Sequence, residues 1–557
     1  MRWLAWMVCG ILLAQEVSAA PPQWAFRVSF TDKTGSPALS NPQAFLSTRA
    51  LQRRSQQGIA VTNSDRPVSP AYIDSVLTIT GGKMHNTSRW FNECVVLLTD
   101  SSKILLLQSK PYISGIEWVG LFSMGLHKGG PITTTGATAV PATSSANKGT
   151  GTAAYYGATW NQTVMVNGDY VHDQSLTGQG QLIAVLDLGF SGSDGHHGFD
   201  SLRNQGRILD EYNFVHANTD IYSIASVHGT YTLSTMAGWM PGTFVGSAPE
   251  AQYALYITDD IQYTDALYEL DNLVAGMERA DSLGADIITT STGYNEFTQP
   301  YYFIYPKAAL DGHSTNVAIA ANMAVSKGIF VVTSAGNEGG NTWDFLLTPG
   351  DADSTLTVGS VNSVRASSGF SSPGPNSSGR IKPDVCMQGD PTAVFSSGNQ
   401  VTTAIGTSFA TPQLAGWAAC IRQIRPTIKP AELLDAINRS ADRYANPTAK
   451  LGYGIPDFKQ VLHAVGVDRT QQASAALTVL PNPFKETIRV QCSLEKPMEV
   501  HCVLTDITGR IVLEQRQMVA AGKQEVLLNM PSTLATGMYQ LTTYIGQQTF
   551  SNKLNRR

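Results

Sequence analysis

The feature that most constrains the fold is the alternation of apolar runs with helical patterns between residues 155 and 467. "QLIAVLDLGF" is a near-continuous apolar run, which is typical of a strand buried on both faces of a parallel sheet. "DALYELDNLVAGMERADSLG" has apolar residues at helical spacing, ends on glycine, and is followed at once by the strand-like "ADIITTSTG". "NVAIAANMAVSKG" and "IFVVTSAGNEGG" repeat the pattern. It predicts an α/β fold with a doubly wound, mostly parallel sheet.

Polar residues stand at the ends of these predicted elements. Asp187 ends "IAVLD", Asn337 ends "FVVTSAGN", and Ser408 follows "TTAIGT" and opens a helix. The carboxyl ends of such strands form one rim of the sheet, where the working residues of this fold lie. His228 begins a helix rich in small residues and is the candidate base. Each residue alone has a structural explanation, such as a helix cap, but the four groups together form a complementary set.

The blocks "VLDLGF", "HGTYTLSTMAG", "SAGNEGG" and "GTSFATPQLAG" resemble the four active-site blocks of the subtilisin-like serine proteases. Their order is that family's order, and the resemblance extends from Asp187 to Phe458. It implies that Ser408 attacks the scissile carbonyl, His228 takes its proton, and Asp187 holds the imidazole. Asn337 would donate to the oxyanion beside the first N–H groups of the helix that contains Ser408.

The resemblance also implies where substrate binds. "TSTGY" resembles the family's strand that pairs with an extended substrate. Together with "SAG" it would line the pocket for the residue before the scissile bond. The implied substrate-binding residues are Ser291, Thr292, Gly293, Tyr294, Ser334, Ala335 and Gly336. Tyr294 stands where subtilisins commonly have glycine, so we expect the pocket to be reshaped.

The chain before the α/β segment divides into three parts. Residues 1–19 have a positive start, a short apolar core and small residues at a cleavage point, which predicts a secretory signal peptide. Residues 20–127 predict a small α+β domain, and residues 128–154, rich in Thr, Ser, Gly, Pro and Ala, predict a linker with a processing site. "FLSTRALQRRSQQGIAV" and "SRWFNECVVLL" resemble the pro-domains of subtilases from Gram-negative gliding bacteria. The resemblance implies an intramolecular chaperone and inhibitor; a permanent accessory domain is the alternative.

After a polar linker at residues 468–476, residues 477–557 show the short strands of an all-β sandwich. Such a sandwich could equally bind carbohydrate or another protein. "LPNPF", "VLTDITGRIV", "LATGMYQLTTYIGQQTFSNKL" and the basic end resemble the type IX secretion sorting domain. This implies contact with the type IX machinery and export through the periplasm of a Gram-negative bacterium, with the protein secreted or at the cell surface. If the runs around Cys492 and Cys502 form a hairpin, their sulfurs face each other, as free thiols or as a disulfide.

Composition excludes other classes of function. The formal net charge is −5 and there is no basic field, so no nucleic-acid partner is expected. No His/Glu pair has the spacing of a metal-dependent hydrolase, and no cofactor is required. The resemblance allows for structural calcium in loops, although no ligand set stands out. The sequence therefore predicts an exported serine endopeptidase acting on proteins or peptides. The alternative is a non-enzymatic surface adhesin on the same scaffold.

Overall fold

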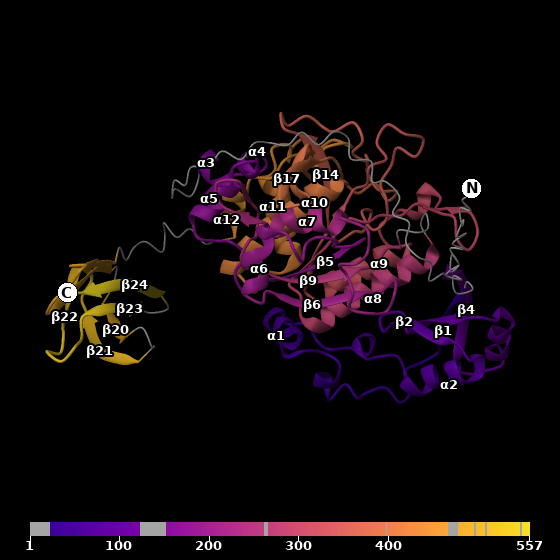
Figure 1. Cartoon of the computed structure of the whole chain (residues 1–557), viewed down its shortest axis with the longest axis horizontal. Coiled ribbons are helices and arrows are strands. Elements are labelled where there is room, and N and C mark those ends of the chain that lie inside the picture. The colour runs from indigo at the N-terminus through magenta and orange to yellow at the C-terminus, as the bar shows by residue number, and fades with distance from the viewer. Residues whose placement is uncertain are drawn as a thin grey trace, which may run out of the picture. The chain divides into compact units, whose positions relative to one another are not determined.

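The computed structural model describes residues 23–122, 152–260, 266–396, 398–465, 477–494, 497–506, 510–545 and 548–557. The predicted signal peptide, most of the first linker and the whole of the second lie outside these residues. The chain divides into two compact units, Met1–Val465 and Gly466–Arg557 (Figure 1). Within the described ranges, no helix combines the length and the hydrophobicity needed to cross a bilayer.

The N-terminal part of the first unit is a four-stranded antiparallel sheet with the strand order β2-β3-β1-β4, flanked by two helices. Both helices begin at serine caps, Ser47 and Ser69, and end at glycines in the left-handed conformation, Gly58 and Gly81. The small α+β domain is therefore present as predicted. The elements are β1 (Gln23–Phe30), η1 (Pro42–Ala44), α1 (Thr48–Gln57), η2 (Asn63–Asp65), α2 (Pro70–Thr80), β2 (Lys83–Ser88), β3 (Glu93–Leu98), η3 (Ser101–Leu107) and β4 (Ile113–Phe122).

The centre of the first unit is a seven-stranded parallel sheet with the order β15-β14-β13-β10-β5-β9-β6. β5 and β13 are buried along their whole length because helices cover both faces. α8 and α9 contact each other on one face, and α7 and α10 contact each other on the other (Figure 1). The doubly wound α/β prediction is confirmed. The strands are β5 (Leu182–Asp187), β6 (Ile208–Asn213), β9 (Gln252–Ile257), β10 (Ile287–Thr290), β13 (Phe330–Ser334), β14 (Leu356–Asn362) and β15 (Val385–Asp390).

The helices of this part and its short peripheral strands complete the first unit. The helices are α3 (Ala153–Tyr156), α4 (Trp160–Val164), α5 (Gly168–Asp173), η4 (His197–Phe199), α6 (Asp200–Asn204), α7 (His228–Ala237), α8 (Leu267–Leu283), η5 (Lys307–Ala309), α9 (Asn316–Ser326), α10 (Thr407–Ile424), α11 (Pro430–Ser440) and α12 (Phe458–Ala464). The strands are β7 (Trp239–Met240), β8 (Phe244–Val245), β11 (Glu296–Phe297), β12 (Phe303–Ile304), β16 (Thr392–Ser396) and β17 (Gln400–Ala404).

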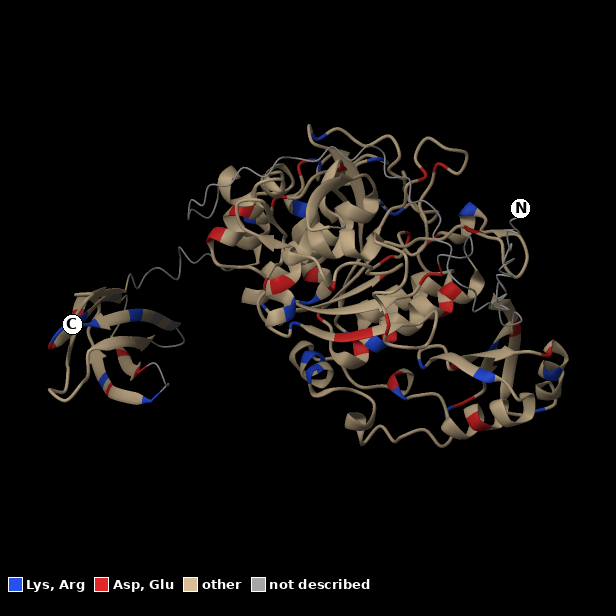
Figure 2. Ribbon diagram, viewed as in Figure 1, with Lys and Arg blue, Asp and Glu red and all other residues tan. Residues whose placement is uncertain are grey.

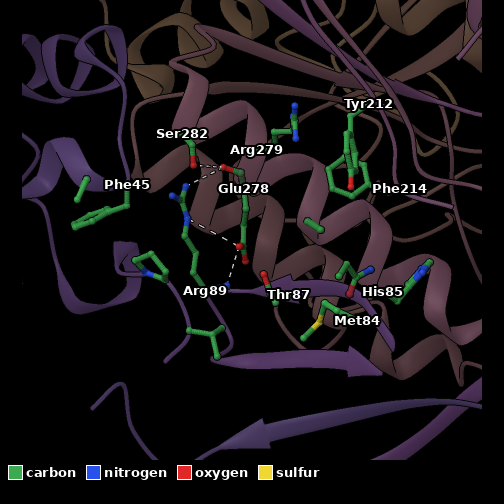
Figure 3. Close-up of a pocket in the computed structure, with 15 residues that line it drawn as sticks. Phe45, Met84, His85, Thr87, Arg89, Tyr212, Phe214, Glu278, Arg279 and Ser282 are labelled. Atoms are coloured by element: carbon green, nitrogen blue, oxygen red, sulfur yellow. Dashed lines mark hydrogen bonds and ion pairs between the residues drawn. The ribbon is translucent and has the colours of Figure 1, made fainter. Parts of the chain in front are cut away.

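The N-terminal sheet packs against α8, and successive side chains of β3 point alternately to two different hydrophobic cores. Val95 and Leu97 join the core that the α/β part shares, whereas Val96 and Leu98 join a separate core under α2. Ion pairs also cross this contact. Figure 2 shows basic residues gathered on α1. Figure 3 shows Arg89 of the N-terminal domain bonded to Glu278 of α8, beside a cavity of about 510 Å³.

The second unit is a sandwich of two antiparallel sheets, β18-β19-β22 and β21-β20-β23-β24. Ile488, Val490 and Cys492 alternate into its core, as the sequence pattern predicted. The strands are β18 (Thr478–Leu480), β19 (Thr487–Leu494), β20 (Met498–Asp506), β21 (Ile511–Val519), β22 (Gly522–Asn529), β23 (Gly537–Ile545) and β24 (Gln548–Arg556).

The hairpin considered for the two cysteines of the sandwich is wrong. Cys492 lies on β19 and pairs with β22, whereas Cys502 lies on β20 between β21 and β23, so the two residues belong to different sheets. Both are free thiols inside the core. Burial raises the pKa of each thiol, which makes both thiols less reactive.

Candidate active site

Asp187 and His228 form a hydrogen-bonded pair at the carboxyl edge of the parallel sheet. Asp187 is the last residue of β5, and His228 is the first residue of α7. His228 Nδ1 lies 2.6 Å from Asp187 Oδ1. The Leu188 N–H donates to the same oxygen at 2.7 Å, and Thr232 Oγ1 donates to Oδ2 at 2.9 Å. The fully buried carboxylate is thus fixed from three sides, and it holds the imidazole through Nδ1.

The surroundings of His228 act on its pKa in opposite directions. Burial lowers it, while the charge of Asp187 and the hydrogen bond to it raise it, and the nearby Asp259 adds to the increase. The net effect is a pKa above the ordinary histidine value. An imidazolium formed by taking up a proton is therefore stabilised, which suits a general base.

Ser408 is the second residue of α10 and is almost fully buried. Its Oγ donates to the carbonyl oxygen of Ser291 at 3.3 Å, and the Ser291 hydroxyl donates back to the Ser408 carbonyl at 2.9 Å. The ring of the next residue, Phe409, lies 5.5 Å from the His228 ring, centre to centre. The structure therefore brings the start of α10, the His228 helix and the Ser291 segment together at one edge.

Asn337 follows β13 and is fixed to the first turn of α10. Its side-chain oxygen accepts from the Thr407 N–H at 2.9 Å and from Thr407 Oγ1 at 3.0 Å. Because that oxygen is bound, the amide nitrogen is left to donate outward. The Phe409 N–H is bound to Gly406 O, whereas the Ser408 N–H has no acceptor among the described residues. The Asn337 amide and the Ser408 N–H are thus two donors available beside the serine.

Tyr294 is bonded within the fold through both its backbone and its side chain. Its backbone N–H and C=O both bond to Thr348, at 2.9 and 3.0 Å, so they are occupied within the fold. Its side chain is buried, and its hydroxyl donates to Asp259 Oδ1 at 2.6 Å. Burial raises the pKa of Tyr294 well above its ordinary value, so the hydroxyl stays protonated as a donor. The tyrosine therefore connects the end of the Ser291 segment to the end of β9.

Two residues at this edge were missed by sequence reasoning. Asp259 follows Thr258, whose N–H donates to the Asp187 backbone carbonyl at 3.0 Å. The polar run "TDD" directly after a buried strand was a signal for it. Leu347 donates its N–H to Ala335 O at 3.1 Å and lies against Gly293 and Gly336. Nothing in its local sequence distinguishes it.

The predicted pocket wall at Ser334, Ala335 and Gly336 continues β13 and is buried. Ala335 N–H donates to Val358 O at 3.0 Å, and Gly336 O accepts from Ser372 N–H at 3.0 Å. Thr292, on the opposite segment, bonds to Thr290 through its hydroxyl. No group of three or more His, Cys, Asp or Glu side chains in the described part of the chain is arranged to hold a metal ion.

Three regions of the chain match known protein families. Residues 178–455 match the Subtilase family, residues 25–128 the Peptidase S8 propeptide domain of Bacteroidota, and residues 478–555 a secretion system C-terminal sorting domain. Subtilisin of Bacillus pumilus is 31% identical over 288 residues, which are 51% of this chain and 92% of that protein.

Two further relatives are similar over a smaller share of their length. Subtilisin E of Bacillus subtilis is 31% identical over 280 residues, covering 50% of this chain and 64% of that protein. Serine protease AprX of Bacillus subtilis is 26% identical over 302 residues, covering 49% and 63%. The chain thus spans a little under two thirds of these two relatives.

A parallel sheet with an Asp–His pair and a helix-opening serine at its carboxyl edge defines the class of α/β serine hydrolases. Within that class, the chain belongs to the subtilase family, a family of serine-type endopeptidases. The family predicted from the four sequence blocks is confirmed, as are the families of the N-terminal and C-terminal segments.

Proposed function

We propose that this protein is an exported serine endopeptidase whose catalytic residues are Asp187, His228 and Ser408. The observation that carries the proposal is the 2.6 Å bond between His228 Nδ1 and Asp187, with Ser408 at the start of the neighbouring helix. Ser408 Oγ attacks the substrate carbonyl while His228 Nε2 takes its proton, and the same proton passes to the leaving amine. The Ser408 hydroxyl donates to Ser291 O at a long 3.3 Å in the structure, and the proposed mechanism requires it to turn to His228 Nε2 when substrate binds.

The negative charge that develops on the substrate oxygen needs donors fixed in advance. The Asn337 amide is turned outward by the bond between its oxygen and Thr407, and the Ser408 N–H is free at the positive end of α10. These two donors form the proposed oxyanion hole. Residues 291–293 directly follow β10, and a substrate strand would add to this segment by β-augmentation.

The flanking segments support a secreted zymogen. Buried ion pairs hold the N-terminal domain against α8, as expected for an inhibitor bound to its own enzyme. Cleavage in the predicted linker would allow this domain to leave. The C-terminal sandwich directs the protein through the type IX machinery after the periplasm is reached. The alternative of an adhesin on the subtilase scaffold gains no specific support, since all four chemical groups are present.

The test compares Ser408→Ala with wild type and with Ser326→Ala, an exposed serine on α9. Wild type and Ser326→Ala should hydrolyse casein and bind a fluorophosphonate probe covalently. Ser408→Ala should do neither, while its thermal unfolding stays like that of the uncleaved wild-type chain. Hydrolysis by Ser408→Ala within tenfold of wild type would refute the assignment of the nucleophile. A wild type that neither hydrolyses nor binds the probe would favour the adhesin.

A further inference from the structure

Two walls of the proposed substrate pocket are joined by a third segment. One wall is the Ser291–Gly293 segment after β10, and the other is Ser334–Gly336 after β13. Between them, the Leu347 N–H donates to Ala335 O at 3.1 Å, and Thr348 exchanges two backbone hydrogen bonds with Tyr294, at 2.9 and 3.0 Å. The Leu347–Thr348 backbone is therefore hydrogen-bonded to Ala335 of one wall and to Tyr294, the residue that follows the other wall.

The side chain of Leu347 occupies the space between the walls. A Cβ placed on Gly336 would lie 2.7 Å from Leu347 Cγ, and one placed on Gly293 would lie 2.9 Å from Leu347 Cβ. Both distances are shorter than real carbon contacts, so the leucine packs directly on the two glycine backbones. Thr348 directs its hydroxyl to Thr315 at 2.6 Å, away from this space, as alternation along an extended segment requires.

Leu347 is packed tightly in this space. Its side chain is only 9% exposed, and it lies against the backbones of Gly293 and Gly336. A larger substrate side chain entering between Gly293 and Gly336 would have to displace it. Because the backbone on either side is hydrogen-bonded, displacement means overpacking, which is costly in a well-packed site.

We propose that Leu347 fills the pocket for the residue before the scissile bond, so that this peptidase cleaves after small residues such as glycine, alanine and serine. The inference rests on the proposed function and names the class of peptide bond that it acts on. Large aromatic and aliphatic residues at that position are excluded by volume, and no charged side chain of the pocket is involved.

The experiment uses the full chain after it has matured, with active sites counted by fluorophosphonate titration. Substrates are tetrapeptide p-nitroanilides that differ only in the last residue: alanine, leucine or phenylalanine. For wild type we expect kcat/KM to be about tenfold or more higher for alanine than for phenylalanine, the size of effect that pocket volume gives. In Leu347→Ala, kcat/KM for phenylalanine should rise by about tenfold, mostly through a lower KM.

Leu346→Ala is the matched control, because Leu346 is a fully buried leucine next in sequence and supplies none of the atoms nearest to the two glycines. Its alanine-to-phenylalanine ratio should equal that of wild type. A second measurement needs no variant: mass spectrometry of casein digested by wild type should show cuts mainly after small residues.

Each outcome has a distinct meaning. Preference of wild type for phenylalanine or leucine, or a ratio that Leu347→Ala leaves unchanged while the variant titrates normally, would overturn the role of Leu347 and leave the proposed function intact. If Leu347→Ala does not fold, the casein digest decides, since cuts mainly after large residues would overturn the inference. Failure of wild type to hydrolyse any peptide would overturn the proposed function, and this inference with it.

Discussion

Asp187 and Asp281 are both completely buried carboxylates, but the first unit surrounds them in opposite ways. Asp187 is held by one backbone N–H, one threonine hydroxyl and one histidine. Asp281, on α8, forms ion pairs with three arginines of the N-terminal domain. The nitrogen–oxygen distances are 2.5 Å for Arg53, 2.8 Å for Arg54 and 2.7 Å for Arg89.

The partners of each carboxylate decide whether the site can change its charge or can only hold two surfaces together. A histidine partner gains and loses a proton near neutral pH, so the Asp187 site can change its charge during a reaction. Arginine partners keep their charge, and their forked donors fix geometry, so the Asp281 site can only hold two surfaces together. The same residue type thus lies in the proposed catalytic site at the sheet edge and in the contact between the N-terminal domain and α8.

The largest expected effect comes from removing the charge of Asp187. Asp187→Asn keeps the shape but favours the wrong imidazole tautomer, so kcat/KM should fall by about 10⁴-fold. With the amide nitrogen facing His228 Nδ1, Thr232 Oγ1 keeps its acceptor oxygen but the Leu188 N–H loses its own, so the free energy of unfolding should fall by about 1–3 kcal/mol. Steady-state kinetics and calorimetry on the same preparation measure both. A loss of less than tenfold would mean that Asp187 does not orient the base.

Asp281→Asn should lower the stability of the N-terminal domain and leave the candidate active site unchanged. It leaves three buried arginines short of a counter-charge, and breaking a buried ion pair costs about 3–5 kcal/mol. In the uncleaved Ser408→Ala chain, the N-terminal domain should therefore unfold at a lower temperature, measured by hydrogen exchange of α1 during heating.

Asp435→Asn is the control for Asp281→Asn. Its partner Arg439 lies 2.7 Å away, but both side chains are more than half exposed. The change should leave the unfolding temperature of the N-terminal domain almost unchanged, because solvent screens this exposed pair. Equal effects of the two substitutions would show that the Asp281 cluster does not hold the domain.

Asn337→Ala should have the next largest effect, a loss of kcat at the candidate active site. Loss of one oxyanion donor lowers kcat by about 10²–10³-fold with KM little changed. Alanine also removes the acceptor for Thr407, so Thr407→Val is the control: it breaks only the 3.0 Å hydroxyl bond to Asn337. Its kcat should stay within tenfold of wild type. Similar losses for both variants would indicate that Asn337 positions α10 and does not donate to the oxyanion.

Sequence patterns predicted the alternating strands and helices of the α/β part. Buried strands such as β5 and glycine-terminated helices such as α8 have a local sequence signature, and the candidate catalytic residues Asp187 and His228 stand at the ends of such elements. The two cysteines show the limit, because alternation identifies the face of a strand but not its partner. Glu278 and Asp281 on α8 have the pattern of solvent-facing charges, yet the N-terminal domain buries them.

The same limit applies within the candidate site. Tyr294 was assigned to the pocket from its place in a motif, but Thr348 and Asp259, which determine where it lies, come from other loops. Leu347 acquires its position only when three chain segments meet. Contacts of this kind depend on tertiary packing, so no window of sequence contains them.

The smallest expected effect is on the pKa of His228, the proposed base. Asp259 is a second carboxylate near this histidine, in addition to Asp187. Burial lowers the pKa of His228, Asp187 raises it, and Asp259 raises it further. Removing the charge in Asp259→Asn should lower that pKa, so His228 stays neutral to a more acid pH. The acid limb of the kcat/KM profile should therefore move to lower pH, by a fraction of a pH unit, with the plateau activity kept.

Tyr294→Phe separates the charge of Asp259 from its support. It removes the hydroxyl that donates to Asp259 at 2.6 Å but leaves the carboxylate charge in place. The acid limb of this variant should not move to lower pH, even if KM rises because the Ser291 segment loses its connection to β9. Profiles of kcat/KM from about pH 5 to 9 for wild type and both variants make the comparison. An acid limb in Asp259→Asn that is unchanged or shifted upward would show that Asp187 alone raises the pKa of the base, and that Asp259 serves only to hold Tyr294.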